Sequence, residues 1–532
     1  MSDNSRAVPE KLIEDINNRV MYHFEEICKV VPRGSKKEEA ICKFLENFVK
    51  ELKEKKGIDL KLERQSESRE GKPVNNIVIT KPAIKEFIGK KDVKKVALQA
   101  HLDMVCQKVD GSEHNFDTMP IITEIKETAD KGRLMTSKGK ETTLGADDGI
   151  GIACIMAVLE SQELSHPEIQ AIFTSDEEDG MRGARWLNPK MVNVDCLINI
   201  DAETEGVLFY GCAGGIYANM NIPVEFQNIP DDMVLYKLEI SGLSGGHSGM
   251  MIDKGYANAN RLMGRALNYL IQDFMKTNDD FFLADISGGD AKNAITTKAV
   301  VVIAVKKNLT EKLEKKKTEI ENIFKYEYAS LEEELKVNVS ECKDLYEKVM
   351  TKETLDKIVT VIMTVPNGVI DMHTKIKGLV ETSSNLGVVA FNGGFVSLIC
   401  FIRSSVESKK LFVVEQMRII AEKAGASFVA DTDCPEWNPD TNSKLVNLFA
   451  KTYKNIFDGK ELTCMSIHAG LECGYFFKHF LNPETQKSID SVAIGPTIDD
   501  VHIPRETLHL DTVKPVVRLL LNVLANMEDY DN

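Results

Sequence analysis

The chain has 532 residues, of which 43% are hydrophobic and 28% are charged, and these proportions are ordinary for a soluble globular protein. A single compact core rarely grows to this length, so we expect two domains or three. The net charge of −16 argues against a general nucleic-acid binder, which needs a basic face.

The sequence also argues against a membrane protein and favours the cytoplasm. No run approaches the roughly 18 apolar residues of a membrane span, and the first residues lack the apolar segment of a signal peptide. The 11 cysteines stand singly, without a CxxC pair, as is typical of reduced thiols in a cytoplasmic protein.

The part of the chain before Ile216 alternates between predicted helices and strands. Helices are expected from about Glu10 to Lys53, where apolar residues such as Ile41 and Phe48 recur at helical spacing. Strands are expected at 74–80, 93–100, 170–175 and 196–200, and a loop that opens a buried helix at 144–160. This alternation predicts an α/β domain with a mostly parallel sheet and helices on both faces.

The pattern changes near Cys212 and returns near Trp437. Between these points we expect alternating strands, a helix at 258–275 and, in a segment rich in Lys and Glu at 308–337, a helix with a solvated face. A helix, a strand and a final helix from about Thr512 then resume the first pattern. We therefore expect an inserted α+β domain at 216–434, within a domain formed by 1–215 and 435–532.

Five imidazole and carboxylate side chains follow apolar, strand-like runs: His101, Asp147, Glu178, Asp201 and His502. Ligand sites in an open α/β sheet lie outside the carboxyl ends of the strands, so distant residues can converge there. These groups are ligands that Zn²⁺, Co²⁺ or Mn²⁺ accept. Each residue alone is more often structural, but the five together predict a two-metal site.

Two further acids accompany these ligands. Asp103 stands two positions after His101, on the same side of an extended chain, where it could accept the second ring N–H of a ligating histidine. Glu177 adjoins Glu178, and neighbouring carboxylates repel unless a cation or a proton separates them. One could bind metal while the other takes a proton from water, although a solvated turn is the ordinary alternative. Paired metal ions activate water and polarise carbonyls, so amide hydrolysis fits.

Several stretches resemble the aminoacyl-histidine (Xaa-His) dipeptidases of the dizinc peptidase family, which also holds the glutamate carboxypeptidases, tripeptidase T and the aminoacylases. They are LQAHLDMVCQK, TTLGADDGIGIA, TSDEEDGMRGA, LINIDAETEG, YGCAGGI, SGLSGGHSGM, IHAGLECG and IGPTIDDVHIPRE. The resemblance covers nearly the whole chain. It implies hydrolysis of dipeptides, carnosine-like ones included, with two Zn²⁺ that Co²⁺ or Mn²⁺ can replace, and a possible homodimer.

Carried over position by position, the resemblance implies His101 and Asp201 on one zinc, Glu178 and His502 on the other, and Asp147 between them. The peptide bond that follows Asp147 would be cis. In the same way Asp103 would orient His101, and Glu177 would be the general base and acid.

The resemblance also makes the inserted segment a lid. His247 would help to stabilise the oxyanion, and Asn293 and Arg403 would hold the terminal carboxylate of the substrate. For Arg403 the ordinary alternative is a surface ion pair at a strand end. The roles of His468 and Glu472 stay open between structural support and substrate contact.

Two acids depart from the family pattern: Asp148 stands where some relatives have Asn, and Asp179 where Ala is common. We expect both to add negative charge near the metals.

Two other functions also stay open. One is a related dizinc enzyme that acts on tripeptides or N-acyl amino acids, and the other is a catalytically silent metal-binding protein, against which the presence of Glu177 beside all five ligands counts.

Overall fold

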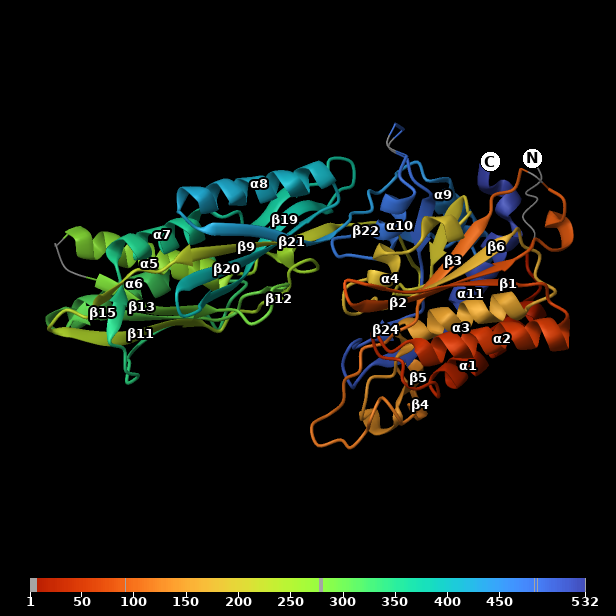
Figure 1. Cartoon of the computed structure of the whole chain (residues 1–532), viewed down its shortest axis with the longest axis horizontal. Helices are drawn as coiled ribbons and strands as arrows, with labels where there is room; N and C mark the ends of the chain where they lie inside the picture. The colour runs from red at the N-terminus through yellow and green to blue at the C-terminus, as the bar shows by residue number, and fades with distance from the viewer. Residues whose placement is uncertain (1–6, 91, 277–280, 483, 486, 532) are drawn as a thin grey trace. The chain divides into compact units, whose positions relative to one another are not determined.

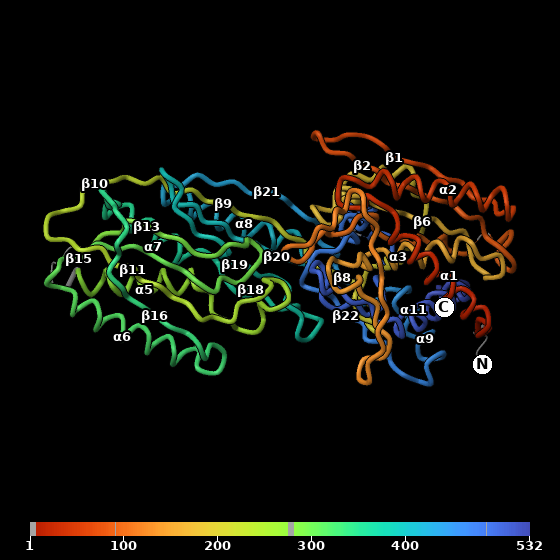
Figure 2. Tube along the Cα trace, turned by 90° about the horizontal axis from the view of Figure 1, so that it is seen from below, coloured from red at the N-terminus to blue at the C-terminus, as the bar shows by residue number. Residues whose placement is uncertain are grey.

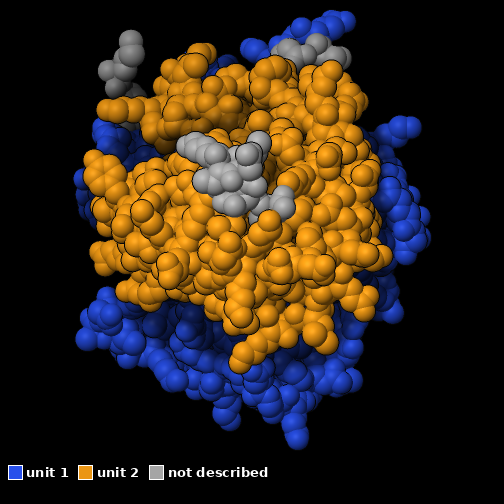
Figure 3. Space-filling model, turned by 90° about the vertical axis from the view of Figure 1, so that its left-hand side faces the viewer, with its two compact units in different colours: residues 1–211, 439–466, 471–532 blue, residues 212–438, 467–470 orange. Residues whose placement is uncertain are grey.

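The computed structural model describes residues 7–90, 92–276, 281–482, 484–485 and 487–531, and these form two compact units (Figures 1 and 3). Unit 1 consists of the described residues of Met1–Gly211, Pro439–Ser466 and Leu471–Asn532, and unit 2 consists of Cys212–Asn438 and Ile467–Gly470. The expected boundaries were 215 and 434, with 435–532 entirely in the first domain. The segment Ile467–Gly470 belongs instead to unit 2. It is joined to that unit by a hydrogen bond from the Ala213 N–H to the Ile467 carbonyl, at 3.1 Å.

Unit 1 is built on an eight-stranded sheet in the order β1-β2-β6-β3-β7-β23-β8-β22. The strands are β1 (Lys61–Arg69), β2 (Lys72–Lys81), β3 (Val96–His101), β6 (Ile169–Thr174), β7 (Cys196–Asn199), β8 (Val207–Cys212), β22 (Thr463–Ile467) and β23 (Asp490–Ala493). The central strands β6, β3, β7 and β23 are parallel, whereas β1, β2 and β8 pair antiparallel. A second, four-stranded antiparallel sheet contains β24 (Ile498–Asp499), β25 (Thr507–His509), β5 (Gly132–Ser137) and β4 (Thr123–Thr128).

Helices cover both faces of the larger sheet. They are α1 (Glu10–Ile27), α2 (Glu39–Lys56), α3 (Ala146–Glu160), α4 (Arg182–Arg185), α9 (Lys444–Ile456), α10 (Cys473–His479) and α11 (Leu510–Ala525). Figure 1 shows α1, α2 and α3 on one face and α9 and α10 on the other. Helices α1 and α11, from opposite ends of the chain, pack side by side (Figure 2). The predicted α/β class with helices on both faces is confirmed, and only the sheet edges are antiparallel.

Helix α3 differs from the other helices because it is apolar on all sides. Every residue from Ala146 to Leu159 is buried, whereas α2 buries one face and exposes lysines on the other. A helix that is hydrophobic all round belongs in a core. The predicted buried helix is therefore confirmed, and its N-terminus, which carries Asp147 and Asp148, is held within the core of unit 1.

Unit 2 is α+β and has its own core. Its nine-stranded sheet contains β16-β11-β15-β13-β19-β20-β9-β21 in that order, with β18 paired to β19. These strands are β9 (Gly214–Pro223), β11 (Met233–Ser241), β13 (Phe281–Gly288), β15 (Ala299–Lys306), β16 (Lys336–Glu341), β18 (Gly368–Met372), β19 (Val380–Phe391), β20 (Phe395–Ser404) and β21 (Ser427–Cys434). Two short pairs join β10 (Phe226–Asn228) to β17 (Lys348–Met350) and β12 (Gly246–His247) to β14 (Ala294–Ile295).

Four helices complete unit 2: α5 (Ala259–Lys276), α6 (Thr310–Glu327), α7 (Lys352–Thr364) and α8 (Glu407–Lys423). Helix α6 buries Leu313, Ile320 and Phe324 and leaves most of its charged residues in solvent, as predicted for this segment. Among the described residues of the whole chain, no helix is long and apolar enough to cross a bilayer.

Candidate metal centre and active site

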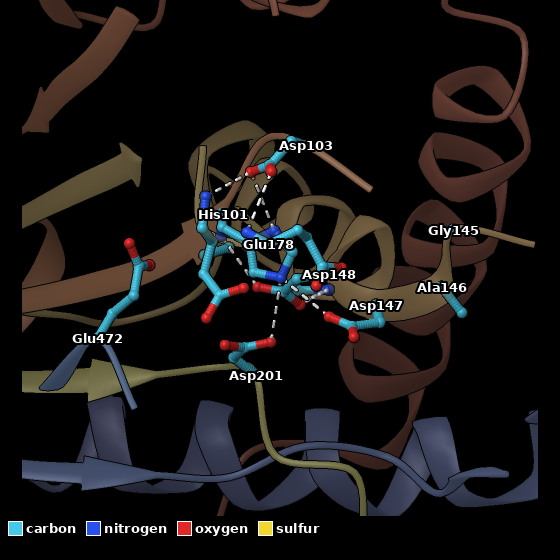
Figure 4. A network of polar contacts seen from close by, with 12 residues as sticks. His101, Asp103, Gly145, Ala146, Asp147, Asp148, Glu178, Asp201 and Glu472 are labelled. Carbon is cyan, nitrogen blue, oxygen red and sulfur yellow. Dashed lines mark hydrogen bonds and ion pairs between the residues drawn. The ribbon is translucent and has the colours of Figure 1, made fainter. Parts of the chain in front are cut away.

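The five side chains predicted as metal ligands meet at the carboxyl ends of the central parallel strands of unit 1. Figure 4 labels four of them: His101, Asp147, Glu178 and Asp201. His101 is the last residue of β3, Glu178 follows β6 and Asp201 follows β7. Asp147 stands at the N-terminus of α3, and His502 lies in the loop between β24 and β25. Their order along the sheet explains how residues hundreds of positions apart reach one site.

The carboxylate of Asp147 lies between two imidazoles. The Nε2 atom of His101 is 2.9 Å from Asp147 Oδ1 and 3.5 Å from Asp201 Oδ1. The Nε2 atom of His502 is 3.0 Å from Asp147 Oδ2 and 2.9 Å from Glu178 Oε2. The result is two groups of donor atoms, one with His101 and Asp201 and one with His502 and Glu178, that share Asp147.

This donor set fits two divalent cations. Each group offers one imidazole nitrogen and carboxylate oxygens within 4.8 Å of one another, and these are the donors that zinc accepts. The Oε1 atom of Glu178 is buried without a hydrogen-bond partner. Within the described part of the chain, no lysine or arginine forms an ion pair with Asp147, Glu178 or Asp201. Cations between these carboxylates would remove their repulsion.

The pKa values in the cluster record the same excess of negative charge. Hydrogen bonds to Asp147 and Glu178 raise the pKa of His502 to about 11. Burial would raise the pKa of Asp147, but its contacts with His101 and His502 lower it below the usual range. Burial raises the pKa of Asp201 to about 6, although His101 opposes the rise. The carboxylates thus favour positive charge at the centre of the cluster.

Asp103 holds the turn that carries Glu177 and Glu178. Its carboxylate accepts the backbone N–H of Glu177 at 3.0 Å and of Glu178 at 3.2 Å, and the hydroxyl of Ser35 at 2.7 Å. The contact with His101 Nδ1 is longer, at 3.5 Å. His101 Nδ1 is buried without a hydrogen-bond partner, so the orienting role of Asp103 stays a prediction. What the structure shows is that Asp103 holds this turn, which local sequence spacing did not reveal.

Glu177 lies beside the two metal groups, and one of its carboxylate oxygens is within 4.8 Å of donor atoms of His101 and Glu178. Burial raises its pKa well above the usual range, and the Glu178, Asp201 and Glu472 carboxylates add to the rise while His101 opposes it. A carboxylate in such surroundings takes up a proton readily, as a general base must.

Glu472 lies at the left of the cluster in Figure 4. Its Oε2 accepts hydrogen bonds from Gln99 Nε2 at 2.7 Å and from Thr174 Oγ1 at 2.6 Å, while its Oε1 is buried without a partner. Burial raises its pKa to about 7. Glu472 thus connects the ends of β3 and β6 to the segment that leads into α10, which is a supporting role.

The two departures from the family pattern have different surroundings. The peptide bond between Asp147 and Asp148 is cis, as the resemblance implied. Asp148 is buried and accepts the backbone N–H groups of His101 and Gly151, each at 3.1 Å, and burial raises its pKa well above the usual range. Asp179 is largely exposed and pairs with Lys36 and Arg182. The negative charge that Asp179 adds is therefore partly compensated by these two cations.

Sequence reasoning missed two side chains that hold the loop before α3. The buried carboxylate of Glu506 accepts hydrogen bonds from the backbone N–H groups of Leu144, Gly145, Ala146 and Asp147. Arg33 Nη2 donates to the Gly145 carbonyl at 2.6 Å. The sequence gives only a weak indication of the role of Glu506. It shares the segment VHIPRE with His502 but belongs to no periodic pattern of apolar residues.

In unit 2, His247 and Arg403 lie together. The Arg403 guanidinium is 3.1 Å from His247 Nε2 and stands 4.2 Å above the Phe401 ring. Burial, followed by the charge of Arg403, lowers the pKa of His247 to about 4. Arg403 is buried, and among the described residues it pairs with no carboxylate. The alternative of a surface ion pair is therefore not observed.

Asn293 and His468 adjoin this pair in the same unit. The Asn293 carbonyl accepts the Ser248 N–H at 2.9 Å, so the backbone of Asn293 supports the His247 loop, while its side chain is exposed. His468 Nε2 lies 2.8 Å from Ser383 Oγ. Burial lowers the pKa of His468 to about 3, and the charge of Arg403 contributes.

Unit 1 also contains a cavity of about 860 Å³ with Glu178 in its wall. The remaining lining includes Lys37, Gln107, Lys108 and His114. A cavity of this size can hold a small-molecule ligand, and Glu178 is the member of the cluster that lines it.

Comparisons with known proteins agree with the chemistry of the cluster. The model of Peptidase family M20/M25/M40 matches residues 97–526. The chain is 36% identical over 504 residues to the cytosol non-specific dipeptidase of Escherichia coli strain K12, which covers 95% of this chain and 96% of that protein. It is 26% identical over 297 residues to peptidase T of Clostridium acetobutylicum, which covers 55% of this chain and 70% of the relative.

Among solved structures, aminoacylhistidine dipeptidase from Vibrio alginolyticus is similar, with a TM-score of 0.81 at 34% identity, over 95% of this chain and 96% of that one. The resemblance inferred from the motifs is thereby confirmed. A family match across most of the chain, together with a cluster of imidazoles and carboxylates at the ends of parallel strands, identifies the class of enzyme. The chain belongs to Peptidase family M20/M25/M40 and is a hydrolase that acts on peptide bonds.

Proposed function

We propose that the chain is a cytoplasmic dipeptidase that uses two zinc ions and hydrolyses dipeptides, Xaa-His dipeptides included. One observation carries the proposal: the Asp147 carboxylate stands between two imidazole-carboxylate groups, with the acid Glu177 beside them. The names of the Escherichia coli and Vibrio alginolyticus relatives, which match nearly the full length of the chain, support dipeptides as substrates.

His101 and Asp201 would hold one ion, Glu178 and His502 the other, and Asp147 both. Zinc fits these nitrogen and oxygen donors, and Co²⁺ or Mn²⁺ would fit them too. When bound, such a pair of ions polarises the peptide carbonyl and makes water more acidic. The two groups of ligand atoms share Asp147, so the loss of this one carboxylate would weaken both metal sites.

Glu177 would move the proton. Its carboxylate would accept a proton from the attacking water and pass it to the leaving amine. Asp103 supports this role, because its hydrogen bonds to the backbone of Glu177 and Glu178 fix the turn. The raised pKa of Glu177 suits both halves of the transfer.

His247, Arg403 and Asn293 would bind the substrate. A guanidinium can only donate, so His247 Nε2 accepts from Arg403 at 3.1 Å in this structure. When Arg403 turns to the substrate carboxylate, with Asn293 assisting it, this contact would be released. The Met250 N–H, 3.3 Å from Nδ1, would then favour Nδ1 as the acceptor and leave the ring proton on Nε2, where it can donate to an oxyanion. The guanidinium has the geometry for its new partner, because it can bind a carboxylate through two parallel hydrogen bonds.

Two further parts of the proposal concern the whole chain. The cytoplasm is proposed because the cysteines stand singly, and no disulfide joins those that the structure describes. A homodimer is also proposed, with no nucleic acid or membrane as partner. Light scattering of the purified protein tests the dimer, and a monomeric mass at micromolar concentration would reject it.

The decisive variant is Glu177→Gln, which keeps the size of the side chain but removes the base. We expect metal content to stay unchanged while kcat on dipeptides falls by about 10²-fold or more, since general acid–base catalysis contributes about that much. Metal analysis and steady-state kinetics measure the two effects. Glu178→Gln is the matched control on the neighbouring residue, and it should lose metal as well as activity.

The substrates for this assay are carnosine, other Xaa-His and neutral dipeptides, tripeptides and N-acyl amino acids. Turnover of dipeptides by zinc-, cobalt- or manganese-loaded protein supports the proposal. Preference for tripeptides or N-acyl amino acids would redirect it to the other branches of the family. Glu177→Gln with the parental kcat would show that the base is another residue.

A further inference from the structure

Glu506 is a buried carboxylate that accepts four backbone hydrogen bonds and has no role in the proposed chemistry. Its Oε2 accepts the N–H groups of Leu144 at 2.8 Å and Gly145 at 2.9 Å, and its Oε1 accepts those of Ala146 at 2.7 Å and Asp147 at 3.2 Å. The residue is 2% exposed. One side chain thus binds every backbone N–H of a four-residue segment from 359 or more positions away.

This segment needs such an acceptor because of its backbone. Gly145 has a left-handed φ of 71°, and Asp147 and Asp148 have non-helical torsions although they stand in the first turn of α3. The N–H groups of residues 144–147 have no acceptor within helix α3, because they come before its first i→i−4 hydrogen bond. All four residues are buried. A buried N–H group without an acceptor is costly, so the loop can keep this conformation only with Glu506 or an equivalent in place.

Glu506 also belongs to the segment that supplies His502. Both lie between β24 and the first residue of β25, and the Glu506 N–H donates to the Ile503 carbonyl at 2.9 Å. His502 Nε2 contacts the Asp147 side chain at 3.0 Å while Glu506 binds the Asp147 backbone. One loop therefore contacts Asp147 from two directions, at its carboxylate and at its N–H.

We propose that Glu506 is a positioning residue for the metal centre: it fixes the backbone of residues 144–147 so that the Asp147 carboxylate stands between His101 and His502. The inference deepens the proposed function and rests on Asp147 as the shared ligand. Glu506 has no direct contact with metal or substrate in this role. Residues that orient ligands in this way commonly alter metal affinity or activity by about 10- to 100-fold when they are changed.

Glu506→Gln tests the inference because it preserves shape while it replaces one acceptor oxygen by an NH₂ group. Two of the four N–H groups would then face a donor. In metal-free protein we expect one pair of amides, either Leu144 and Gly145 on Oε2 or Ala146 and Asp147 on Oε1, to exchange hydrogen about tenfold faster or more than in the parent. We also expect zinc affinity, measured by competition with a chelator, to fall by about 10- to 100-fold, with kcat reduced and KM for dipeptides nearly unchanged.

Asp490→Asn is the matched control in the same unit. Asp490 stands at the start of β23, opposite the strand ends that carry the site, and accepts the Leu445 N–H at 2.9 Å and the Ser443 hydroxyl at 2.6 Å. It should lower the melting temperature without changing zinc affinity or the exchange of Gly145. If Glu506→Gln does not fold, Glu506→Asp, which keeps both oxygens on a shorter side chain, replaces it under the same measurements.

The readouts separate the two proposals. A parent protein that binds no zinc and cleaves no dipeptide would overturn the proposed function, whereas amide exchange in metal-free protein still tests the positioning of the loop. A folded Glu506→Gln protein with parental amide exchange and parental zinc affinity would overturn the positioning role. So would an equal loss of zinc affinity in Asp490→Asn, because the effect would then be one of general stability.

Discussion

Gly145 is the residue at which the backbone and the site are most tightly coupled. It has a φ of 71°, and a Cβ atom added there would lie 2.4 Å from Arg33 Nη2 and 2.7 Å from Met104 Sδ. Its carbonyl accepts Arg33 and its N–H donates to Glu506. Only glycine combines this torsion with this close approach, and the position of Asp147 depends on it.

Gly145→Ala should therefore cost more than the backbone torsion alone. We expect a lower free energy of unfolding, by more than the roughly 1–2 kcal/mol that a left-handed torsion costs an L-residue, and weaker zinc binding. Gly139→Ala is the control, because Gly139 has a φ of 66° with nothing near the added Cβ atom. Urea unfolding measures the free energy of unfolding of both variants, and competition with a chelator measures their zinc affinity. Equal losses of both quantities in Gly139→Ala and Gly145→Ala would show that the close approach at Gly145 is not the cause.

Among the elements, strand pairings set the positions of His247 and Arg403, a short pairing for His247 and long ones for Arg403. Strand β12 pairs with β14 so that His247 faces Ala294, beside Asn293. Arg403 lies near the end of β20, where its register places it opposite Ser383 of β19 and Gly215 of β9. These neighbours are small, and they leave the guanidinium to stack on Phe401 and to reach His247.

Arg403→Lys should selectively weaken recognition of the substrate carboxylate. Lysine keeps the charge but cannot form two parallel hydrogen bonds, so we expect KM for dipeptides to rise about tenfold or more, in line with a hydrogen bond between charged groups. Dipeptide amides, which lack the carboxylate, should show no such difference between parent and variant. Arg418→Lys, on the exposed face of α8 and paired with Glu415 and Glu422, is the control, and a matching rise in KM there would contradict the assignment.

For the whole molecule, each unit has its own hydrophobic core. The core of unit 1 draws on both ends of the chain, with Phe24 of α1, Phe449 of α9 and Leu521 of α11 in one buried cluster. Unit 1 also contains a fully buried histidine. Burial lowers the pKa of His166 to about 3, and the charge of Lys81 adds to this. Unit 1 therefore buries this imidazole in its neutral form.

Because His166 is buried in its neutral form, the free energy of unfolding depends on pH. Unfolded His166 binds a proton below about pH 6.5, whereas the folded chain binds it only near pH 3. Its contribution is complete above pH 6.5 and is lost as the pH falls towards 3, with a slope of about 1.4 kcal/mol per pH unit. In His166→Gln that slope of the free energy of unfolding should be smaller by about this amount.

The two tryptophans allow a clean measurement, since Trp186 lies in unit 1 and Trp437 in unit 2. In a Trp437→Phe background, the fluorescence of Trp186 reports on urea unfolding of unit 1 between pH 7 and 4.5, in chelator to keep metal out. The comparison uses slopes, so a constant loss of stability in His166→Gln does not affect it. Identical slopes in the two proteins would refute the prediction.

Much of the local structure could be predicted from the sequence. The apolar run from Ile150 to Leu159 indicated a buried helix, and the alternation of helices and strands indicated an α/β sheet. The ligand candidates were recognisable because the ends of parallel strands share one edge of a sheet, so position along the chain carries information about position in space. The compact units differ from the expected boundaries at residues 467–470, where a hydrogen bond joins Ile467 to Ala213, far away in the sequence.

Residue type and position at strand ends were enough to predict the candidate ligands His101, Asp147, Glu178, Asp201 and His502, with Glu177 beside them. Tertiary structure alone decided how they are held. The four hydrogen bonds to Glu506 and the contacts of Asp103 with the Glu177–Glu178 turn join segments far apart in the chain. The physical reason is that periodicity reports which face of an element is buried, whereas a buried N–H group accepts any suitable carboxylate that the fold brings within reach.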